Sequence, residues 1–408
     1  MDAHAASDVF LAEGRPPALR IHGAVRLLAM QPTSRADLEA LIAEALPAAV
    51  LARFRDTGDV DAGLSLPDGR RFRLNVSRQQ GQVAVVARAV PSGALDPDTL
   101  HLPDIVRALA DRPRGLVLVT GATGSGKSTT LAAMVHHINQ HRQVHIVTIE
   151  DPIEFVHADL RARVTQREIG TDTASFQEAL KHVVRQSPDV IVIGEMRDAE
   201  TMTVAVTAAL TGHLVLASLH TIDATQTLQR ILSNFPDHLR GQVAMDLSMS
   251  LQGVVSQRLL PRADGQGRVL AAEILVVSPA VARLLREQRV DDLGDLMRSL
   301  RSPGMRTFNA ALLDLFQKGF ISHETGMAYA TNPDEFALAT KGMSTGTASF
   351  VSDGSEDAEE GLDMQRLLNT VLEREASDLH LTVGRPAILR INGELVPLGA
   401  RPLSEADM

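Results

Sequence analysis

The sequence contains no cysteine, few aromatic residues and no long run of apolar residues. Without cysteine, disulfides and thiolate metal sites are excluded, so histidine and carboxylate side chains remain as the protein ligands for a metal. No stretch reaches the run of about 18 apolar residues that a membrane span requires, and Met1 to Phe10 lacks both a basic leader and an apolar run. We therefore expect a cytoplasmic chain without direct membrane insertion.

Basic residues are also in deficit, because 40 Lys and Arg residues face 50 Asp and Glu residues, for a formal net charge of −10. This balance opposes a broad basic surface for nucleic acid. An aromatic content of 3% leaves few side chains that could stack on bases. No nucleic-acid partner is expected.

The 408 residues, 44% of them hydrophobic, can bury a sizeable core and should form several domains. Short alternating segments and one helical pattern predict a small α+β domain at 1–100. Apolar runs that alternate with amphipathic helices predict an α/β core at 101–278, with parallel strands buried on both faces. A helical region is expected at 279–340. The predicted strands are Ala18 to Ile21, Arg71 to Val76, Gln82 to Ala87, Leu116 to Val119, Val144 to Ile149, Val190 to Ile193 and Leu214 to Ala217; the predicted helices are Arg35 to Leu46, Val281 to Glu287, Phe308 to Gln317 and His323 to Ala330.

The C-terminal part repeats the N-terminal part. Residues 341–361 are rich in Gly, Ser and Thr and then acidic, which predicts a flexible linker. Beyond it, Ala376 to Gly393 matches Ala6 to Gly23 at an offset of 370, with 11 of 18 positions identical. Residues 362–408 are therefore interpreted as a partial second copy of the N-terminal domain, in a truncated tandem of two units.

A phosphate-binding loop follows the first predicted core strand. Gly121 to Ser128 reads G-A-T-G-S-G-K-S and fits the pattern G-x-x-x-x-G-K-[ST], between an apolar strand and a predicted helix. Glycines let backbone N–H groups turn towards phosphate oxygens, and the helix N-terminus adds positive charge. A Gly-rich structural turn is the alternative, which the strand and helix context disfavours. The candidate nucleotide-binding residues are Gly121, Thr123, Gly124, Ser125, Gly126, Lys127, Ser128 and Thr129.

Carboxylates follow two further predicted strands. Glu195 comes after Val190 to Ile193, and Glu150 and Asp151 come after Val144 to Ile149, with Glu154 close behind. A nucleotide site needs such side chains to hold Mg²⁺ and to orient the attacking water. Taken singly, an acidic residue at a strand end is more often solvated. Two such ends after a phosphate-binding loop favour an ATP and Mg²⁺ site.

Three segments together resemble a known family. Thr148 to Phe155, Ile193 to Asp198 and Thr211 to Thr221 resemble the aspartate box, Walker B motif and histidine box of secretion and pilus ATPases, over roughly residues 6 to 340. The resemblance implies that Glu154 is the catalytic base and that Glu195 is the Walker B glutamate. Ser128 and Glu195 are then the expected Mg²⁺ ligands. It also implies that His213 and His220 sense the nucleotide and contact a neighbouring subunit. Without it, both histidines would be read as ordinary core or turn residues.

Arginines of the N-terminal domain complete the resemblance. Arg71 to Val76 and Val85 to Arg88 resemble the family's segment whose arginines reach the γ-phosphate, which carries over to Arg73 and Arg88. The planar guanidinium suits this task because it binds phosphate through two N–H groups. A solvated strand edge is the alternative.

The missing cysteines indicate a branch of this family. Extension and secretion motors carry a four-cysteine zinc module, whereas this chain has none and resembles the PilT and PilU retraction ATPases, PilU more closely. The resemblance implies a RecA-like P-loop core, a PAS-like N-terminal domain and a ring, expected to be a hexamer, that hydrolyses ATP to power type IV pilus retraction in twitching motility. It also implies a location at the inner face of the cytoplasmic membrane, through a pilus platform protein and a PilT-type partner motor.

Other functions stay open. The chain could instead be a nucleotide-binding accessory or regulatory subunit of a PilT-type motor, or a type II or type IV secretion ATPase. Leu210 stands where retraction motors have glutamate, and Pro279 to Glu287 matches only part of their platform-coupling motif. The family's first helix precedes the second copy, at 362–374, rather than the first. Three explanations are open: a chain that is a fragment at both ends, docking of this helix on a neighbour's N-terminal domain, or a disordered tail.

Overall fold

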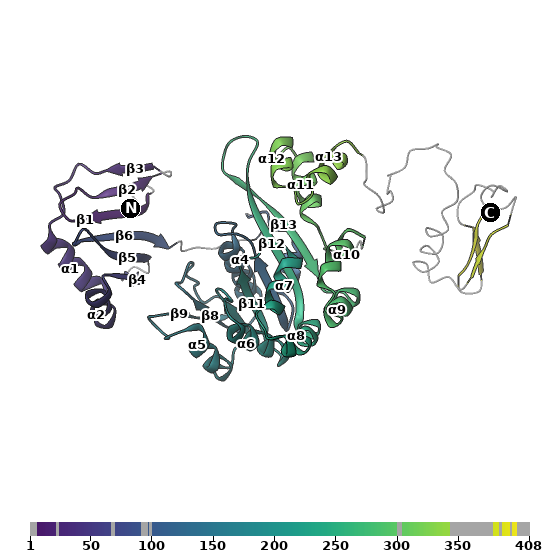
Figure 1. Ribbon diagram of the computed structural model, residues 1–408, viewed down its shortest axis with the longest axis horizontal. Coiled ribbons are helices and arrows are strands. Elements are labelled where there is room, and N and C mark those ends of the chain that lie inside the picture. Colours follow the sequence, from purple (N-terminus) through teal and green to yellow (C-terminus); the bar gives the residue numbers. More distant parts are fainter. Residues whose placement is uncertain are drawn as a thin grey trace. The chain divides into compact units, whose positions relative to one another are not determined.

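The computed structural model describes residues 6–21, 24–66, 70–90, 97, 100–299, 304–342, 378–382, 386–391 and 394–397. By internal contacts the chain separates into two units, Met1–Ala348 and Ser349–Met408. The first unit holds two sheets and the helices that cover them (Figure 1), and the second holds one small sheet. In the described part of the chain, no helix combines the length and the apolar character needed to cross a bilayer.

A seven-stranded sheet forms the centre of the first unit, in the order β13-β12-β7-β11-β10-β8-β9. All neighbouring strands run parallel except β12 and β13, which form an antiparallel pair at one edge. The four strands predicted for the core coincide with β7, β8, β10 and β11, whereas β9, β12 and β13 had no prediction. The strands are β7 (Gly115–Thr120), β8 (His145–Glu150), β9 (Arg163–Glu168), β10 (Val190–Ile193), β11 (Leu214–Leu219), β12 (Leu251–Pro261) and β13 (Arg268–Val276).

Helices cover both faces of this sheet. Along β11, Leu214 and Leu216 pack into one apolar cluster with α3 and α4, while Val215 and Ala217 pack into the other with α6, α7 and α8. All four side chains are fully buried, as expected for a parallel strand between two helical layers. The helices are α3 (Asp104–Ala110), α4 (Lys127–His141), α5 (Phe176–Val183), the 3₁₀ helix η2 (Val184–Gln186), α6 (Ala199–Leu210), α7 (Ala224–Ser233) and α8 (Asp237–Ser250).

The helical region after the sheet packs on the β12–β13 hairpin. Phe308 of α11 and Phe336 of α13 are fully buried in one cluster with Leu260 of β12 and Ala271 of β13. Helix α12 approaches closely because Gly326 has no side chain: a Cβ there would lie 2.3 Å from the Phe336 ring. The elements are α9 (Pro279–Arg286), η3 (Val290–Asp292), α10 (Leu293–Ser299), α11 (Phe308–Gln317), α12 (His323–Tyr329) and α13 (Pro333–Thr340).

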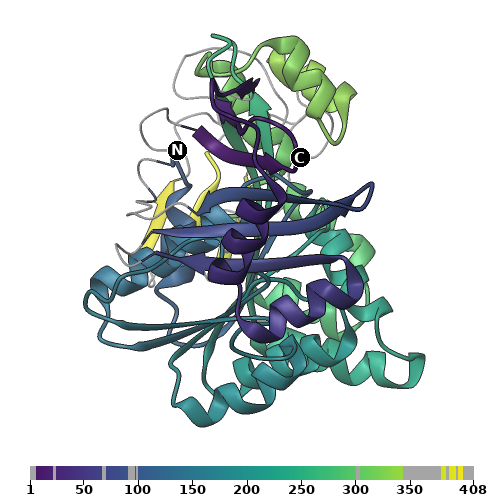
Figure 2. The same cartoon turned by 90° about the vertical axis from the view of Figure 1, so that its left-hand side faces the viewer.

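The N-terminal part is a six-stranded antiparallel sheet in the order β3-β2-β1-β6-β5-β4, with two helices beside it (Figure 2). Its core joins Leu38 and Phe54 of the helices to Val76 of β5 and Val85 of β6. The predicted segments match β2, β5, β6 and α1. The elements are β1 (Ala6–Ala12), β2 (Ala18–Ile21), β3 (Ala24–Leu27), α1 (Arg35–Ala45), α2 (Ala48–Thr57), β4 (Asp59–Ser65), β5 (Arg71–Gln79) and β6 (Gln82–Val90).

The second unit contains β14 (Asp378–His380), β15 (Ile388–Ile391) and β16 (Glu394–Pro397) in the order β14-β15-β16. Asp378 lies opposite Arg390, as Asp8 lies opposite Arg20 in β1 and β2. The Arg390–Asp378 ion pair of 3.2 Å repeats the Arg20–Asp8 pair of 3.3 Å. The two copies, which lie 370 residues apart in the sequence, therefore have the same strand register. The helix expected at 362–374 and the linker from residue 343 onwards lie outside the described residues.

Candidate nucleotide site

The glycine-rich loop lies between β7 and α4. Gly121, Gly124 and Gly126 have φ values of 146°, 78° and 96°, a region of backbone conformation that favours glycine. A Cβ at residue 121 would lie 2.4 Å from the Oγ of Ser125 and 2.6 Å from the carbonyl oxygen of Gln257. Helix α4 begins at Lys127 without a side-chain cap, so its first amides stay available to an anion.

Two side chains of the loop fit a phosphate group. Lys127 is buried, and its Nζ donates to the carbonyl oxygens of Gly121 at 2.8 Å and Ala122 at 3.1 Å. Burial lowers the pKa of Lys127, while the charges of Glu195 and Glu154 act in the opposite direction. The Oγ of Ser125 is buried and has no hydrogen-bond partner among the described residues. A buried hydroxyl without a partner is costly, and an anion in the loop would satisfy it.

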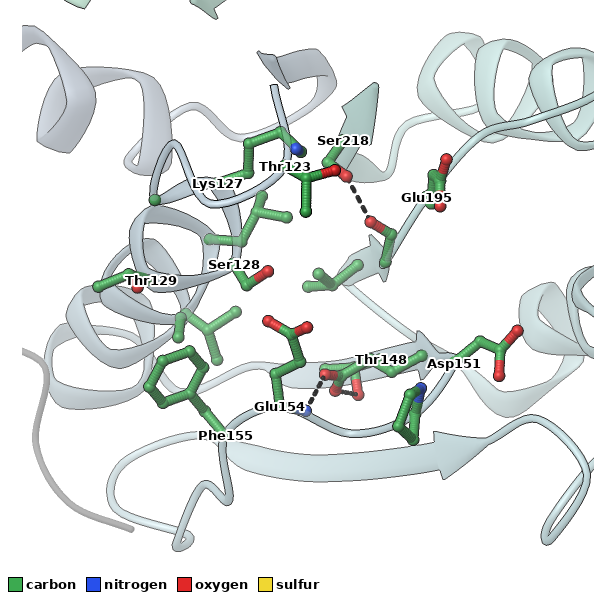
Figure 3. A pocket seen from close by; sticks show the side chains of 18 of the residues that line it. Thr123, Lys127, Ser128, Thr129, Thr148, Asp151, Glu154, Phe155, Glu195 and Ser218 are labelled. Atoms are coloured by element: carbon green, nitrogen blue, oxygen red, sulfur yellow. Dashed lines mark hydrogen bonds between the residues drawn. The ribbon is translucent and has the colours of Figure 1, made fainter. Parts of the chain in front are cut away.

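A cavity of about 420 Å³ opens beside the loop. It lies where β7, β8, β10 and β11 end, which is where parallel sheets bind their ligands. Figure 3 shows the carboxylate of Glu154 pointing into the cavity towards Ser128, with Glu195 on the far side. The predicted residues that line it are Thr123, Gly124, Gly126, Lys127, Ser128, Thr129, Glu154, Glu195 and His220.

Glu195 and Lys127 are linked through His220. The His220 Nε2 lies 3.2 Å from the Glu195 Oε1, and its Nδ1 lies 3.4 Å from the Lys127 Nζ. Arg197 donates to the other carboxylate oxygen of Glu195 at 2.8 Å. These contacts place the glutamate after β10 and the histidine after β11 in one polar chain with the lysine of the loop.

Glu154 is held through its backbone by a second carboxylate. Its N–H donates to the Oε2 of Glu150 at 3.2 Å, and Thr148 donates to the Oε1 of Glu150 at 2.7 Å. Burial raises the pKa of Glu150, against the effect of the hydrogen bonds from Thr148 and Gln166. The Asp151–Pro152 peptide bond between these residues is cis.

A histidine also lines the cavity without a predicted role. Burial, and secondarily the neighbouring His136, lowers the pKa of His157 to about 4. At neutral pH this imidazole is therefore uncharged and cannot act as an acid. Among the carboxylates that line the cavity, Glu154 and Glu195 are the two for which the sequence predicts a catalytic role.

Besides Gly121 and Ser125 of the loop, three predicted residues do not line the cavity. Arg73 lies beside it, where its guanidinium contacts the Oε1 of Glu154 at 3.4 Å. Arg88 donates instead to Asp8 at 2.7 Å. His213 precedes β11 and contacts the carbonyl oxygen of Ala208 at 3.0 Å, at the strand end opposite to His220 and about 20 Å away for a strand of this length. The structure thus brings Arg73 and His220 to the site, but neither Arg88 nor His213.

Several contacts of the site involve residues without a prediction. Arg71 and Gly63 of the N-terminal sheet and Gln166 and Glu168 of β9 meet near the loop that carries Glu154. A spacing of two is the signal that was available, since Arg71 shares a strand face with Arg73, and Gln166 shares one with Glu168. In the described ranges, no group of three or more histidine and carboxylate side chains could hold a metal ion.

Comparisons with known proteins agree with this geometry. The sequence family described as type II/IV secretion system protein matches residues 94–362. The type IV pilus retraction ATPase PilT of Pseudomonas aeruginosa is 42% identical over 331 residues, covering 81% of this chain and 96% of that protein. PilU, a type IV pilus ATPase of the same organism, is 40% identical over 346 residues, covering 85% and 91%. These two values do not separate the branches, so the preference for PilU stays a prediction.

Solved structures agree with these sequence comparisons. A crystal structure of the pilus retraction motor PilT with bound ADP matches with a TM-score of 0.77 and 42% identity, over 82% of this chain and 96% of that one. The ATPase DotB of Legionella pneumophila matches with a TM-score of 0.66 and 27% identity, over 80% and 92%. The predicted α/β fold class and the resemblance to pilus ATPases are confirmed.

Proposed function

Because the chain belongs to the type II/IV secretion system protein family, among the type IV pilus ATPases of the PilT and PilU kind, we propose that it hydrolyses ATP to power pilus retraction. One observation carries the proposal most directly. The glycine-rich loop with Lys127 and the carboxylates of Glu154 and Glu195 border a single cavity. This arrangement supplies phosphate binding and water activation in one place.

Nucleotide binding rests on the loop and the start of α4. The backbone amides of residues 121–129 and the Nζ of Lys127 would bind phosphate oxygens, and the Ser125 hydroxyl would gain the partner that it lacks. Lys127 would exchange its contacts with Gly121 and Ala122 for the phosphates. The hydroxyl of Ser128 and the carboxylate of Glu195 are the expected contacts of Mg²⁺. This ion, when bound, would neutralise charge on the phosphates.

Glu154 is the proposed catalytic base. Its carboxylate points into the cavity, its backbone is fixed by Glu150, and the exposed fraction of its side chain, 42%, leaves it accessible to water. A water would attack the terminal phosphorus and pass a proton to this carboxylate, while the bond from that phosphorus to the ADP oxygen breaks. Arg73 is proposed to turn from Glu154 to that group and stabilise its charge.

Arg88 and His213 belong to a different part of the proposal. Neither lines the cavity of its own chain, so their predicted roles require a second copy at the site. We propose a ring, expected to be a hexamer, in which the P-loop of one subunit faces the next subunit. Closure of the N-terminal domain over ATP would supply the power stroke. A platform protein at the inner face of the cytoplasmic membrane and a PilT-type partner motor are the proposed partners, and β14–β16 are proposed as part of a second N-terminal domain.

A test follows from Lys127. Replacing it with Ala should remove ATP binding and hydrolysis, because the loop loses its only lysine and the side chain that reaches the phosphates. Hydrolysis is measured by phosphate release and binding by a fluorescent ATP analogue. If Lys127→Ala binds and hydrolyses ATP like the wild type, the proposed site is wrong.

A second candidate function is an accessory subunit of a PilT-type motor. The identities of 42% to PilT and 40% to PilU are too close to separate these two branches of the family. Phosphate release by the isolated chain is therefore compared with release by its mixture with a PilT-type protein. An autonomous motor should hydrolyse ATP alone, whereas an accessory subunit should do so only in the mixture.

A further inference from the structure

Strand β9 holds the loop 151–157, which carries Glu154. The side-chain amide of Gln166 donates to the carbonyl oxygen of Phe155 at 2.8 Å and accepts from the N–H of His157 at 2.9 Å. The Oε2 of Glu168 accepts from the N–H of Ile153 at 3.0 Å. Residues on both sides of Glu154 are therefore bound by two side chains of one strand face.

Glu168 also binds the N-terminal domain. An Arg71 guanidinium nitrogen donates to the same Oε2 at 2.5 Å, and the exposed fractions of the two side chains are 17% and 2%. A buried carboxylate needs such a partner, because an unpaired charge away from water is costly. One oxygen atom thus connects β5 of the N-terminal sheet to the residue directly before Glu154.

The strand beside β5 leaves room for this contact. Gly63 of β4 lies opposite Arg73, and a Cβ at residue 63 would lie 2.5 Å from the Arg71 guanidinium and 2.6 Å from the Oε1 of Glu168. Any larger residue would press on the ion pair. Two residues along the same face of β5, Arg73 contacts Glu154 itself. The N-terminal domain therefore contacts the loop 151–157 directly through Arg73, and Arg71 reaches it indirectly through Glu168 of β9.

We propose that Glu168 is a positioning residue for Glu154. It fixes the backbone in front of Glu154, and through Arg71 it makes the placement of this carboxylate depend on the position of the N-terminal domain. The inference rests on the proposed function, because it assumes that Glu154 is the base. It adds the route by which a movement of the N-terminal domain changes the rate of hydrolysis in the same subunit.

Three substitutions separate the contacts that Glu168 makes with Arg71 and with Ile153. Arg71→Ala removes the ion pair and leaves the bond to Ile153. Glu168→Gln keeps a side-chain oxygen for Ile153 but offers Arg71 no charge. Glu168→Ala removes both, together with the hydrogen bond that the Thr171 hydroxyl donates to the Glu168 Oε1 at 3.3 Å. Arg35→Ala and Glu39→Ala, in an exposed Arg–Glu pair of 2.8 Å within α1, are the matched controls.

The expected effects are on turnover rather than on binding. Glu168→Ala should lower kcat about 100-fold, since a displacement of about 1 Å at a reacting group costs that much, with the ATP dissociation constant changed less than about threefold. Arg71→Ala and Glu168→Gln should each lower kcat about tenfold, and their combination should be no worse than either alone, because both remove the same interaction. Arg71→Lys should restore part of the rate by keeping the charge.

Hydrogen exchange of the full chain, measured by mass spectrometry, supplies a readout that needs no activity. Exchange in the peptide covering 151–157 should be faster in Glu168→Ala than in the wild type, and unchanged in Glu39→Ala. Wild-type exchange and turnover in Glu168→Ala would overturn the inference, and so would additive losses in the Arg71→Ala and Glu168→Gln pair. A wild-type chain that neither binds nor hydrolyses ATP would instead overturn the proposed function, while the exchange data would still decide whether Glu168 holds this loop.

Discussion

Replacing Glu154 with Gln tests the proposed chemistry most sharply. The two side chains have the same shape, so the contacts of Phe155 and Ile153 with β9 should persist, as should the bond from the Glu154 N–H to Glu150. What disappears is the group that accepts a proton. The charge facing Arg73 at 3.4 Å disappears as well.

The two losses differ in size. The ion pair to Arg73 is more than one-third exposed on both sides, and exposed pairs contribute about 0–1 kcal/mol to stability. The loss of a general base lowers a rate about 10²- to 10⁴-fold, which is about 2.7–5.4 kcal/mol of barrier. We therefore expect turnover to fall at least 100-fold, while the midpoint of denaturant unfolding moves little.

The assay compares phosphate release, binding of a fluorescent ATP analogue and urea unfolding in Glu154→Gln and the wild type. Glu200→Gln is the control, because Glu200 forms an exposed pair with Lys181 at 3.6 Å away from the cavity. ATP binding should survive in both variants and hydrolysis only in the control. Hydrolysis at the wild-type rate in Glu154→Gln would refute the assignment of the base.

The pKa of His157 is about 4 in the folded chain and 6.5 in the unfolded chain. As pH falls below 6.5, the unfolded chain binds a proton at His157 before the folded chain does, so the free energy of unfolding decreases. Above pH 6.5 this loss of stability is absent. Wild-type stability should therefore drop by about 2 kcal/mol more between pH 8 and pH 5 than that of His157→Phe in urea titrations, and the exposed His238→Gln should not reproduce this difference. Removing Mg²⁺ with EDTA should stop hydrolysis, and Glu195→Gln should need more Mg²⁺ for half-maximal rate; an unchanged Mg²⁺ requirement would argue against Glu195 as a ligand. Arg73→Ala should lower kcat about 10³-fold without loss of ATP binding in the fluorescence assay, and a wild-type kcat would rule out its role at the phosphoryl group.

The elements with the clearest sequence signals were predicted correctly. The strands β7, β8, β10 and β11 are apolar runs in the sequence because both of their faces are buried. Helix α4 follows a loop whose glycines and lysine match the phosphate-binding pattern. The strands β9, β12 and β13 had no prediction. β9 reads R-V-T-Q-R-E, and its polar side chains would suit a solvated segment equally well. Of these side chains, Gln166 binds the loop 151–157, and Glu168 binds both this loop and Arg71.

The residues of the site divide in the same way. The local sequence identifies Lys127, Ser128 and Glu195 as candidate site residues, since each follows the end of a predicted strand at a short distance. It does not show that His220 lies between Lys127 and Glu195, or which end of β11 borders the cavity. Two histidines of one motif can be separated by a whole strand, and only the strand direction in the sheet decides which of them reaches the cavity.

The sequence by itself determined that an apolar strand, a phosphate-binding loop and acidic strand ends are present, because hydrophobic periodicity and motif spacing are local properties of the chain. The tertiary structure alone decided which distant side chains meet. Arg71 and Glu168 are 97 residues apart in sequence, and their contact depends on how the N-terminal sheet packs on β9. Sheet register and domain packing depend on many weak contacts between parts of the chain that are distant in sequence. These contacts cannot be read from any short segment of the sequence.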